Sequence, residues 1–333
     1  MRMPLVRGLL PTVLLLTTAA PAPILPAGPR YGVYLRLVDA PLGSYEQMSA
    51  AVAPAIQNVG WQLLATHDVA TGGCQYKARV FVVQAPSYAA EVLKNGPRAA
   101  FAIPLRLAVF QDEQGTHLAV ANPQNLARTI VGETFEGPPA QVVAQLRTMT
   151  ASGFPGKPVA VQYGQMRDQG LIEKTMGIMA GGPFAGKIDP IRSTKATAAM
   201  GPREVADRIM AASKQATGRW GMHSVYRLDL PEQNAVLIGL NGDAMEWKAF
   251  GIVGPGLDET RKSFACPGID HAAAFPVELL IVREGDQVRV LLIDEMFRMK
   301  IYFEDAGKMK FAANMQMPGS IADEIRDLVD DAY

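Results

Sequence analysis

Two stretches of the chain share one pattern, and that pattern decides the fold we expect. Residues 101–121 read FAIPLRLAVFQDEQGTHLAVA, and residues 274–293 read AFPVELLIVREGDQVRVLLI. Each stretch contains a proline, a strand, a short polar turn and a second strand. The prolines, Pro104 and Pro276, lie 172 residues apart, and the same offset aligns the apolar positions of both strands without a gap. The sequence therefore predicts a duplicated hairpin.

The segments around each hairpin occur in the same order, which extends the repeat to a whole folding unit. Trp61 begins the earlier hairpin of the first unit, and Trp220 occupies the corresponding place in the second. The first unit is predicted to contain a strand at 31–39, a helix at 44–59, a hairpin at 61–84, a short helix at 86–95 and, after the duplicated hairpin, a helix at 138–149. The second is predicted to contain helices at 202–217, 244–251 and 320–332 and a hairpin at 225–240, with an insertion within 254–271.

The region between the units offers two candidates for the first strand of the second unit. Residues 152–200 are rich in Gly, Pro and Lys, and they contain strand-like runs at 159–165 and 175–179. We favour 159–165. The expected organisation is a signal peptide at 1–27, a first α+β domain at 28–153, a linker that could hold this strand at 154–200, and a second α+β domain at 201–333.

Composition and charge agree with two packed domains. Hydrophobic residues make up 49% of the 333 residues and charged residues 19%, which is enough apolar material for folded cores. Lys plus Arg and Asp plus Glu both number 32, so no excess of positive charge favours nucleic acid. We expect an unknown small molecule or protein as the partner, and no nucleic acid.

The first residues have the three-part pattern of a secretory signal. Arg2 and Arg7 precede an apolar run at 8–20, GLLPTVLLLTTAA, and small residues and prolines follow. The run is shorter than the roughly 20 residues that span a bilayer. We expect cleavage after Ala27 or near Ala19, no integral membrane segment afterwards, and a periplasmic or secreted protein.

Two cysteines become informative if the chain is exported, because oxidising compartments permit disulfides. Cys74 follows a pair of glycines in a turn, and Cys266 precedes a proline in a loop. A bridge between them would join the two halves of the chain. Two unpaired thiols are the alternative, and neither spacing matches a zinc or redox motif.

The first unit resembles the bacterial and archaeal domain of unknown function 302 family. The resemblance rests on the order of elements, on a proline-headed hairpin of the form P-x-R/E, and on the run from Asn122 to Leu126 that follows it. It implies a curved antiparallel sheet with helices on one face, similar to the TATA-box-binding protein and birch-pollen-allergen class, in two tandem copies. The second copy is divergent, with Asp294, Glu295 and a strand-like run at 297–304 in the corresponding place. The family supplies no established activity.

A glycine-rich segment and the four histidines are candidates for a phosphate-binding loop and a metal site. Residues 181–187, GGPFAGK, match the spacing of a phosphate-binding loop, but Ile188 replaces the required Ser or Thr and Pro190 interrupts any following helix, which favours a flexible linker. The four histidines have no partner at metal-ligand spacing, so we interpret them as ordinary, partly exposed residues and predict no metal.

The methionines suggest one further alternative. The chain has 16, and five of them cluster towards the end, at Met296, Met299, Met309, Met315 and Met317. Thioether clusters can hold copper(I), and they equally fill irregular cores or adaptable binding surfaces. A core or interface role is favoured, with copper handling as the alternative.

Polar residues at the ends of the duplicated strands are the candidate site. Asn122 ends the strand of the first copy, and Asp294 and Glu295 end that of the second. Polar groups at a strand end could line a pocket beside the sheet. We therefore predict a non-catalytic module that binds a small ligand or a protein without a cofactor, with an enzyme acting at these strand ends as the alternative.

Overall fold

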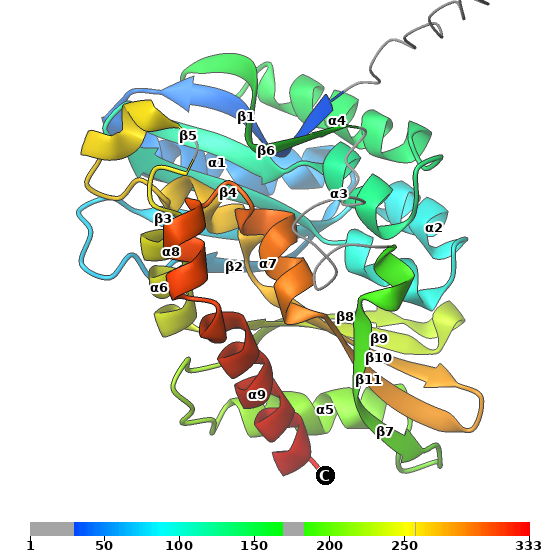
Figure 1. The fold of residues 1–333 in the computed structure, drawn as a ribbon. Coiled ribbons are helices and arrows are strands. Elements are labelled where there is room, and N and C mark those ends of the chain that lie inside the picture. The colour runs from blue at the N-terminus through cyan, green and yellow to red at the C-terminus, as the bar shows by residue number, and fades with distance from the viewer. Residues whose placement is uncertain (1–29, 169–182, 257) are drawn as a thin grey trace, which may run out of the picture.

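The computed structural model describes residues 30–168, 183–256 and 258–333. Two antiparallel sheets organise these residues, one above the other in Figure 1, with helices around them. The first sheet has six strands in the order β2-β3-β4-β5-β1-β6, and the second has five in the order β7-β11-β10-β9-β8. The chain is thus an α+β protein with two sheets. The predicted signal peptide at 1–27 and the strand-like run at 175–179 lie outside the described residues.

The elements have the following bounds. The first sheet contains β1 (Arg30–Ala40), β2 (Gln62–Asp68), β3 (Ala78–Gln84), β4 (Leu105–Asp112), β5 (Gly115–Ala121) and β6 (Lys157–Asp168), and the second contains β7 (Ile188–Lys195), β8 (His223–Leu230), β9 (Ala235–Asn241), β10 (Val277–Glu284) and β11 (Gln287–Ile293). The helices are α1 (Tyr45–Asn58), α2 (Pro86–Leu93), α3 (Pro123–Ile130), α4 (Gly137–Thr150), α5 (Pro202–Ser213), α6 (Asp243–Val253), α7 (Glu295–Phe303), α8 (Lys308–Ala313) and α9 (Gln316–Asp331).

The two sheets share one topology. Read from its other end, the second sheet runs β8-β9-β10-β11-β7, which matches β2-β3-β4-β5-β1 element for element. The bounds of β4 and β10, and of β5 and β11, also differ by the offset seen in the sequence. In the first sheet β6 is additional, because it pairs with the outer side of β1.

The favoured assignment of 159–165 is therefore wrong. This run lies in β6, which pairs antiparallel with β1, and the Tyr163 ring stacks on Tyr34 at 5.1 Å. The first strand of the second sheet is β7, which pairs with β11. Alternation along the chain identifies a strand, but it does not say which strand edge the segment will cover.

The sequence predicts a strand-like run at 297–304, but the structure has helix α7 there instead. The carboxylate of Asp294 caps the helix by accepting a hydrogen bond from the Phe297 amide at 2.6 Å. Phe297 and Ile301, four residues apart, are both buried on one face of the helix. The second half consequently resembles the first more closely than the sequence suggests, since α3 follows β5 in the same way.

A short helical segment from each half packs against the sheet of the other half. The segment Pro97–Ala102 precedes β4 and packs against β9 and β10, whereas Ile269–Ala274 precedes β10 and packs against β3, β4 and β5. The longer helices stay with their own sheets, α1 on the first and α5 on the second. The contact between the halves is thus reciprocal.

A buried ion pair lies in this contact. Arg106 Nη1 is 2.7 Å from Glu278 Oε1, and both side chains are only 2% exposed. The two residues occupy equivalent places in β4 and β10, so one position of the repeat carries opposite charges in its two copies. Arg106 also donates to the Tyr302 hydroxyl and to the Pro276 carbonyl oxygen.

A disulfide joins the halves a second time. Cys74, between β2 and β3, is bonded to Cys266, after α6, with the Cα atoms 6.3 Å apart although the two residues are 192 positions apart in the chain. The two cysteines therefore form a disulfide and are not free thiols, the two alternatives that the sequence leaves open.

A close contact between the halves lies near the disulfide. Gly72, with φ of +59°, lies so close to the Trp247 ring that a Cβ there would overlap it.

Among the described residues, no helix has both the length and the apolar character needed to cross a membrane.

Removal of the bridge should destabilise the protein markedly. A paired change, Cys74→Ser with Cys266→Ser, should lower the free energy of unfolding by about 2–5 kcal/mol, because a long loop becomes open in the unfolded chain. Chemical denaturation with and without reductant measures this. Reductant should destabilise the wild type and leave the paired variant unchanged; a wild type insensitive to reductant would contradict the expectation.

Loss of one partner of the buried ion pair should cost more than loss of an exposed pair on the same strand. Glu278→Gln should reduce the free energy of unfolding by about 3–5 kcal/mol, since it leaves a buried guanidinium without its carboxylate. The matched control is Glu284→Gln, which breaks the partly exposed pair with Arg98 and should cost at most about 1 kcal/mol. Equal losses in urea denaturation would show that the buried pair has no special weight.

Candidate functional site

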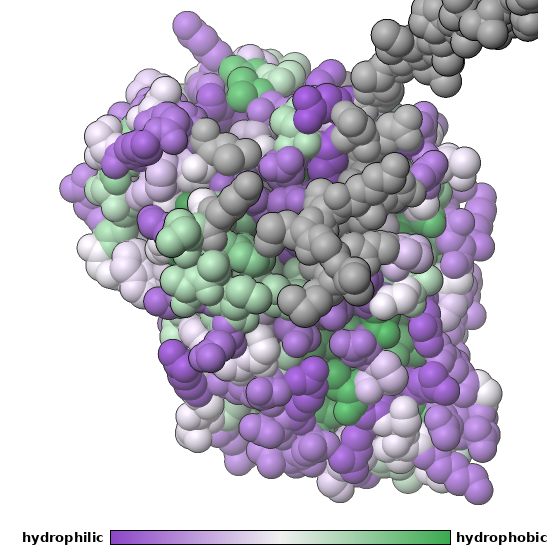
Figure 2. Space-filling view, viewed as in Figure 1, coloured by the Kyte–Doolittle hydropathy of each residue, from purple (hydrophilic) through white to green (hydrophobic). Residues whose placement is uncertain are grey.

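An apolar pocket lies at one end of the second sheet. It is bounded by α6, α7 and α9 and by the sheet residues where β10 begins and β11 ends, and its cavity volume is about 70 Å³. This volume is below the roughly 300–1,000 Å³ of most small-molecule sites. Figure 2 shows hydrophobic side chains at the surface on the face that carries α8 and α9. Three methionines, Met245, Met299 and Met317, are among the lining residues.

Two charged side chains line the pocket, and both come from α7. Glu295 and Arg298 are three residues apart and therefore lie on one side of the helix. Glu295 is 28% exposed, and Arg326 Nη2 lies 3.9 Å from its carboxylate. Arg298 is 8% exposed, so it sits deeper in the wall. The pocket thus has an acidic rim and a basic interior.

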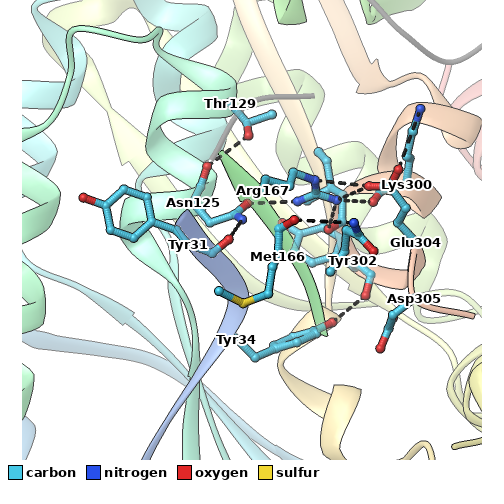
Figure 3. Close-up of polar contacts among 12 residues, drawn as sticks. Tyr31, Tyr34, Asn125, Thr129, Met166, Arg167, Lys300, Tyr302, Glu304 and Asp305 are labelled. Carbon is cyan, nitrogen blue, oxygen red and sulfur yellow. Dashed lines mark hydrogen bonds and ion pairs between the residues drawn. The ribbon is translucent and has the colours of Figure 1, made fainter. Parts of the chain in front are cut away.

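Helix α7 is held in place by groups from the first half of the chain. Figure 3 shows Arg167 of β6 reaching the end of α7, where Nη2 donates to the carbonyl oxygens of Lys300 at 2.5 Å and Ile301 at 3.1 Å. The same guanidinium pairs with Glu304 at 3.0 Å. A guanidinium at a helix C-terminus satisfies free carbonyl oxygens and balances the helix dipole. The pocket wall in the second half therefore depends on β6 of the first.

A second contact at the same end of α7 comes from β1. The Tyr34 hydroxyl donates to the Tyr302 carbonyl oxygen at 2.9 Å (Figure 3), and the Tyr34 side chain is fully buried. Burial raises the pKa of Tyr34 well above its ordinary value, with a smaller contribution from Asp305, so the hydroxyl stays protonated and remains a donor.

The predicted site residues lie in different places. Asn122 is 1% exposed and caps α3: its side-chain oxygen accepts from the Gln124 amide, and its Nδ2 donates to the Gly32 carbonyl oxygen at 2.9 Å. Asp294 has the equivalent capping role for α7. Glu295 alone of the three lines the pocket. Polar residues at these strand ends thus begin the helices that follow.

Carboxylates of the second half gather beside the pocket. Oxygen atoms of Asp189, Asp294 and Glu295 lie within 4.8 Å of one another, and all three residues are half-buried. Oxygen donors of this type suit hard cations such as Ca²⁺. Part of the charge is already balanced, because Asp294 caps a helix N-terminus and Arg326 approaches Glu295.

Two histidines are buried, which corrects the interpretation of all four as partly exposed. His271 is 2% exposed and lies between carboxylates, with Nδ1 2.9 Å from Asp270 and Nε2 3.0 Å from Asp305. His117, also 2% exposed, has Asp39 at 2.7 Å and Asp112 at 3.0 Å. The sequence could not show this, because one partner of each histidine, Asp305 for His271 and Asp39 for His117, is distant along the chain.

The environment of His271 makes it a permanent cation near neutral pH. Burial lowers its pKa, but Asp305 and Asp270 more than offset this and raise the pKa to about 10. The same arrangement, with Arg261 also present, lowers the pKa of Asp270 to about 2 despite its burial. The ring stacks against Phe303, the last residue of α7, so this group also supports the pocket wall.

Comparison with known proteins identifies the first part of the chain. A family described as "Domain of unknown function DUF302" matches residues 38–152, so these residues form a DUF302 domain of unknown function, while the second sheet lies outside the match. A solved structure, the uncharacterized conserved protein DUF302 from Bacillus stearothermophilus, is similar at 15% identity and a TM-score of 0.31, covering 36% of this chain and 94% of that one. No curated protein matches.

Stability should fall as pH rises from about 6.5 to about 10. The pKa of His271 is raised on folding, so its contribution is fully present below the unfolded value of about 6.5 and is lost as pH passes the folded value of about 10. In His271→Gln we expect a loss of at least about 2 kcal/mol near neutral pH and a flatter pH dependence.

Urea denaturation at several pH values measures both effects. The matched control is His223→Gln, because His223 is exposed and its replacement should change stability by less than about 0.5 kcal/mol. If His271→Gln kept the pH slope of the wild type, the charged ring would not be the source of that slope.

Proposed function

We propose that the protein is a non-catalytic binding protein and that its ligand is a small apolar molecule held in the pocket between α6, α7 and α9. The observation that carries this proposal is the pocket itself, whose walls are almost entirely apolar. Exposed apolar surface of this kind is unfavourable in water unless something covers it. Adaptable methionine side chains in the wall would suit ligands of varied shape.

The strand ends give less support to the enzyme alternative. Both Asn122 and Asp294 use side-chain oxygens to cap the helices that follow, so their presence at the strand ends has a structural explanation. Copper handling by methionines stays an alternative prediction. Met309 and Met315 of that cluster are exposed, whereas Met299 and Met317 line the apolar pocket.

We also propose that the second sheet is a divergent second copy of the first domain and that both have the TATA-box-binding-protein-like fold. The common strand order, the equal spacing of the hairpins and the two equivalent helix caps support this. The signal-like first residues and the disulfide both favour export to the periplasm or beyond, since disulfides persist in oxidising compartments.

A substitution that fills the pocket tests the binding proposal. Ala249 is buried in the pocket wall on α6, and Ala249→Phe should weaken binding of the neutral fluorescent probe N-phenyl-1-naphthylamine by about tenfold or more, because the ring takes the space of the ligand. Fluorescence titration gives the affinity.

The control is the same replacement at an exposed alanine of the same helix. Ala244→Phe should leave the affinity within about twofold of the wild type. Saturable binding that neither change affects would place the ligand elsewhere, and a wild type that binds no apolar probe would refute the proposal. Thermal unfolding of both variants confirms that they are folded.

A further inference from the structure

Arg298 is placed unusually for a charged side chain. It lines the apolar pocket, is 8% exposed, and has its guanidinium over the rings of Phe275 at 5.9 Å and Tyr302 at 5.0 Å. Its Nη2 donates to the carbonyl oxygens of Ala274 at 2.6 Å and Pro276 at 3.0 Å. The Nε atom is buried and has no hydrogen-bond partner among the described residues.

The buried charges around Arg298 do not balance. Arg106 and Arg298 both lie close to the Tyr302 ring, and the carboxylate in this cluster is Glu278. Glu278 pairs with Arg106 at 2.7 Å, whereas Arg298 has no carboxylate oxygen within 4.0 Å in the part of the chain that the structure describes. A guanidinium stays protonated in proteins, and a buried charge is normally paired. Among the described residues, two buried guanidiniums therefore share one carboxylate, and that carboxylate contacts Arg106.

Other polar groups of the cluster are also short of partners. Arg106 Nε and the Tyr226 hydroxyl are buried and make no hydrogen bond to any described residue. Tyr226 and Glu278 both lie opposite Gly239 in neighbouring strands, so they are on the same face of the sheet. The cluster thus contains several unused donors and a single carboxylate, which is the composition of an anion-binding environment.

The rim of the pocket does not cancel this preference. Glu295 is one turn before Arg298 and is more exposed, and Arg326 lies beside it. The rim of the pocket therefore carries the negative charge of Glu295, which Arg326 partly balances, and the interior carries the positive charge of Arg298. Apolar residues of α6 and α9, including Ala249, Ile321 and Ile325, form the walls on either side.

We infer that the pocket binds an amphipathic anion, a hydrocarbon chain that ends in a carboxylate, with Arg298 as the counter-ion of the carboxylate. This inference rests on the proposed function, and it adds the class of ligand. The chain covers the apolar walls, and the carboxylate accepts hydrogen bonds from the guanidinium, which are among the strongest available in a dry site. The carboxylate then supplies a negative charge beside Arg298, where the carboxylate of Glu278 is already paired with Arg106.

Ligands of equal chain length and different head groups test the inference without any mutation. We would measure displacement of N-phenyl-1-naphthylamine by dodecanoate, dodecan-1-ol and dodecyltrimethylammonium at a pH where the carboxylate is ionised. Dodecanoate should bind about tenfold or more tightly than the alcohol, and the ammonium compound should bind worst.

The outcomes separate the inference from the proposed function. Alcohol and carboxylate of equal affinity would overturn the choice of ligand class and leave the apolar binding site standing. If no probe or chain compound binds, the proposed function fails as well. A stable dimer in light scattering whose pocket admits none of these compounds would show instead that a second copy covers this surface.

Variants of Arg298 then locate the head group. Arg298→Gln should remove the preference for dodecanoate and leave dodecan-1-ol within about twofold, while Arg298→Lys should keep part of the preference because it keeps the charge. The control is Arg326→Gln, which removes a partly exposed cation on α9 and should preserve the preference. A preference that persists in a folded Arg298→Gln variant would overturn the role of this residue.

Discussion

The ion pair between Arg106 and Glu278 is the constraint on which the arrangement of the two halves depends. Both groups are removed from water, and each would be strongly destabilising alone. Because they occupy one position of a repeated hairpin, two identical copies would place like charges together in the contact. The halves can pack in this way only if the copies differ at this position. An ion pair at this place therefore requires that the two halves carry different residues there.

Much of the architecture follows from patterns that are local in the sequence. The duplicated hairpins at 101–121 and 274–293 appear as β4, β5, β10 and β11, and their turns and alternation are sufficient to predict them. The partner of β6 could not be predicted, because strand pairing is decided by long-range packing. The residues of helix α7, EMFRMKIYF, predict a strand because they are largely apolar and aromatic, and short apolar runs are ambiguous between the two structures.

The sequence predicts the candidate pocket only in part. The sequence points to the end of β11, where the pocket lies, and it selects Glu295, which lines the pocket, together with Asn122 and Asp294, which cap helices. Arg298 was missed. The available signal was an arginine inside an apolar helix, next to the proline-headed strand that its side chain contacts. An arginine in an apolar helix can be recognised as part of a site only when its burial and the charges of its neighbours are known.

The disulfide has a consequence for the order of events during synthesis. Cys74 belongs to the DUF302 domain, and its partner Cys266 follows 192 residues later. The residues of the first domain are thus synthesised well before Cys266, and Cys74 stays a thiol until that partner is present. During that interval, the only correct partner of this thiol has not yet been made. Correct oxidation of the protein therefore depends on the second half arriving before any other thiol does.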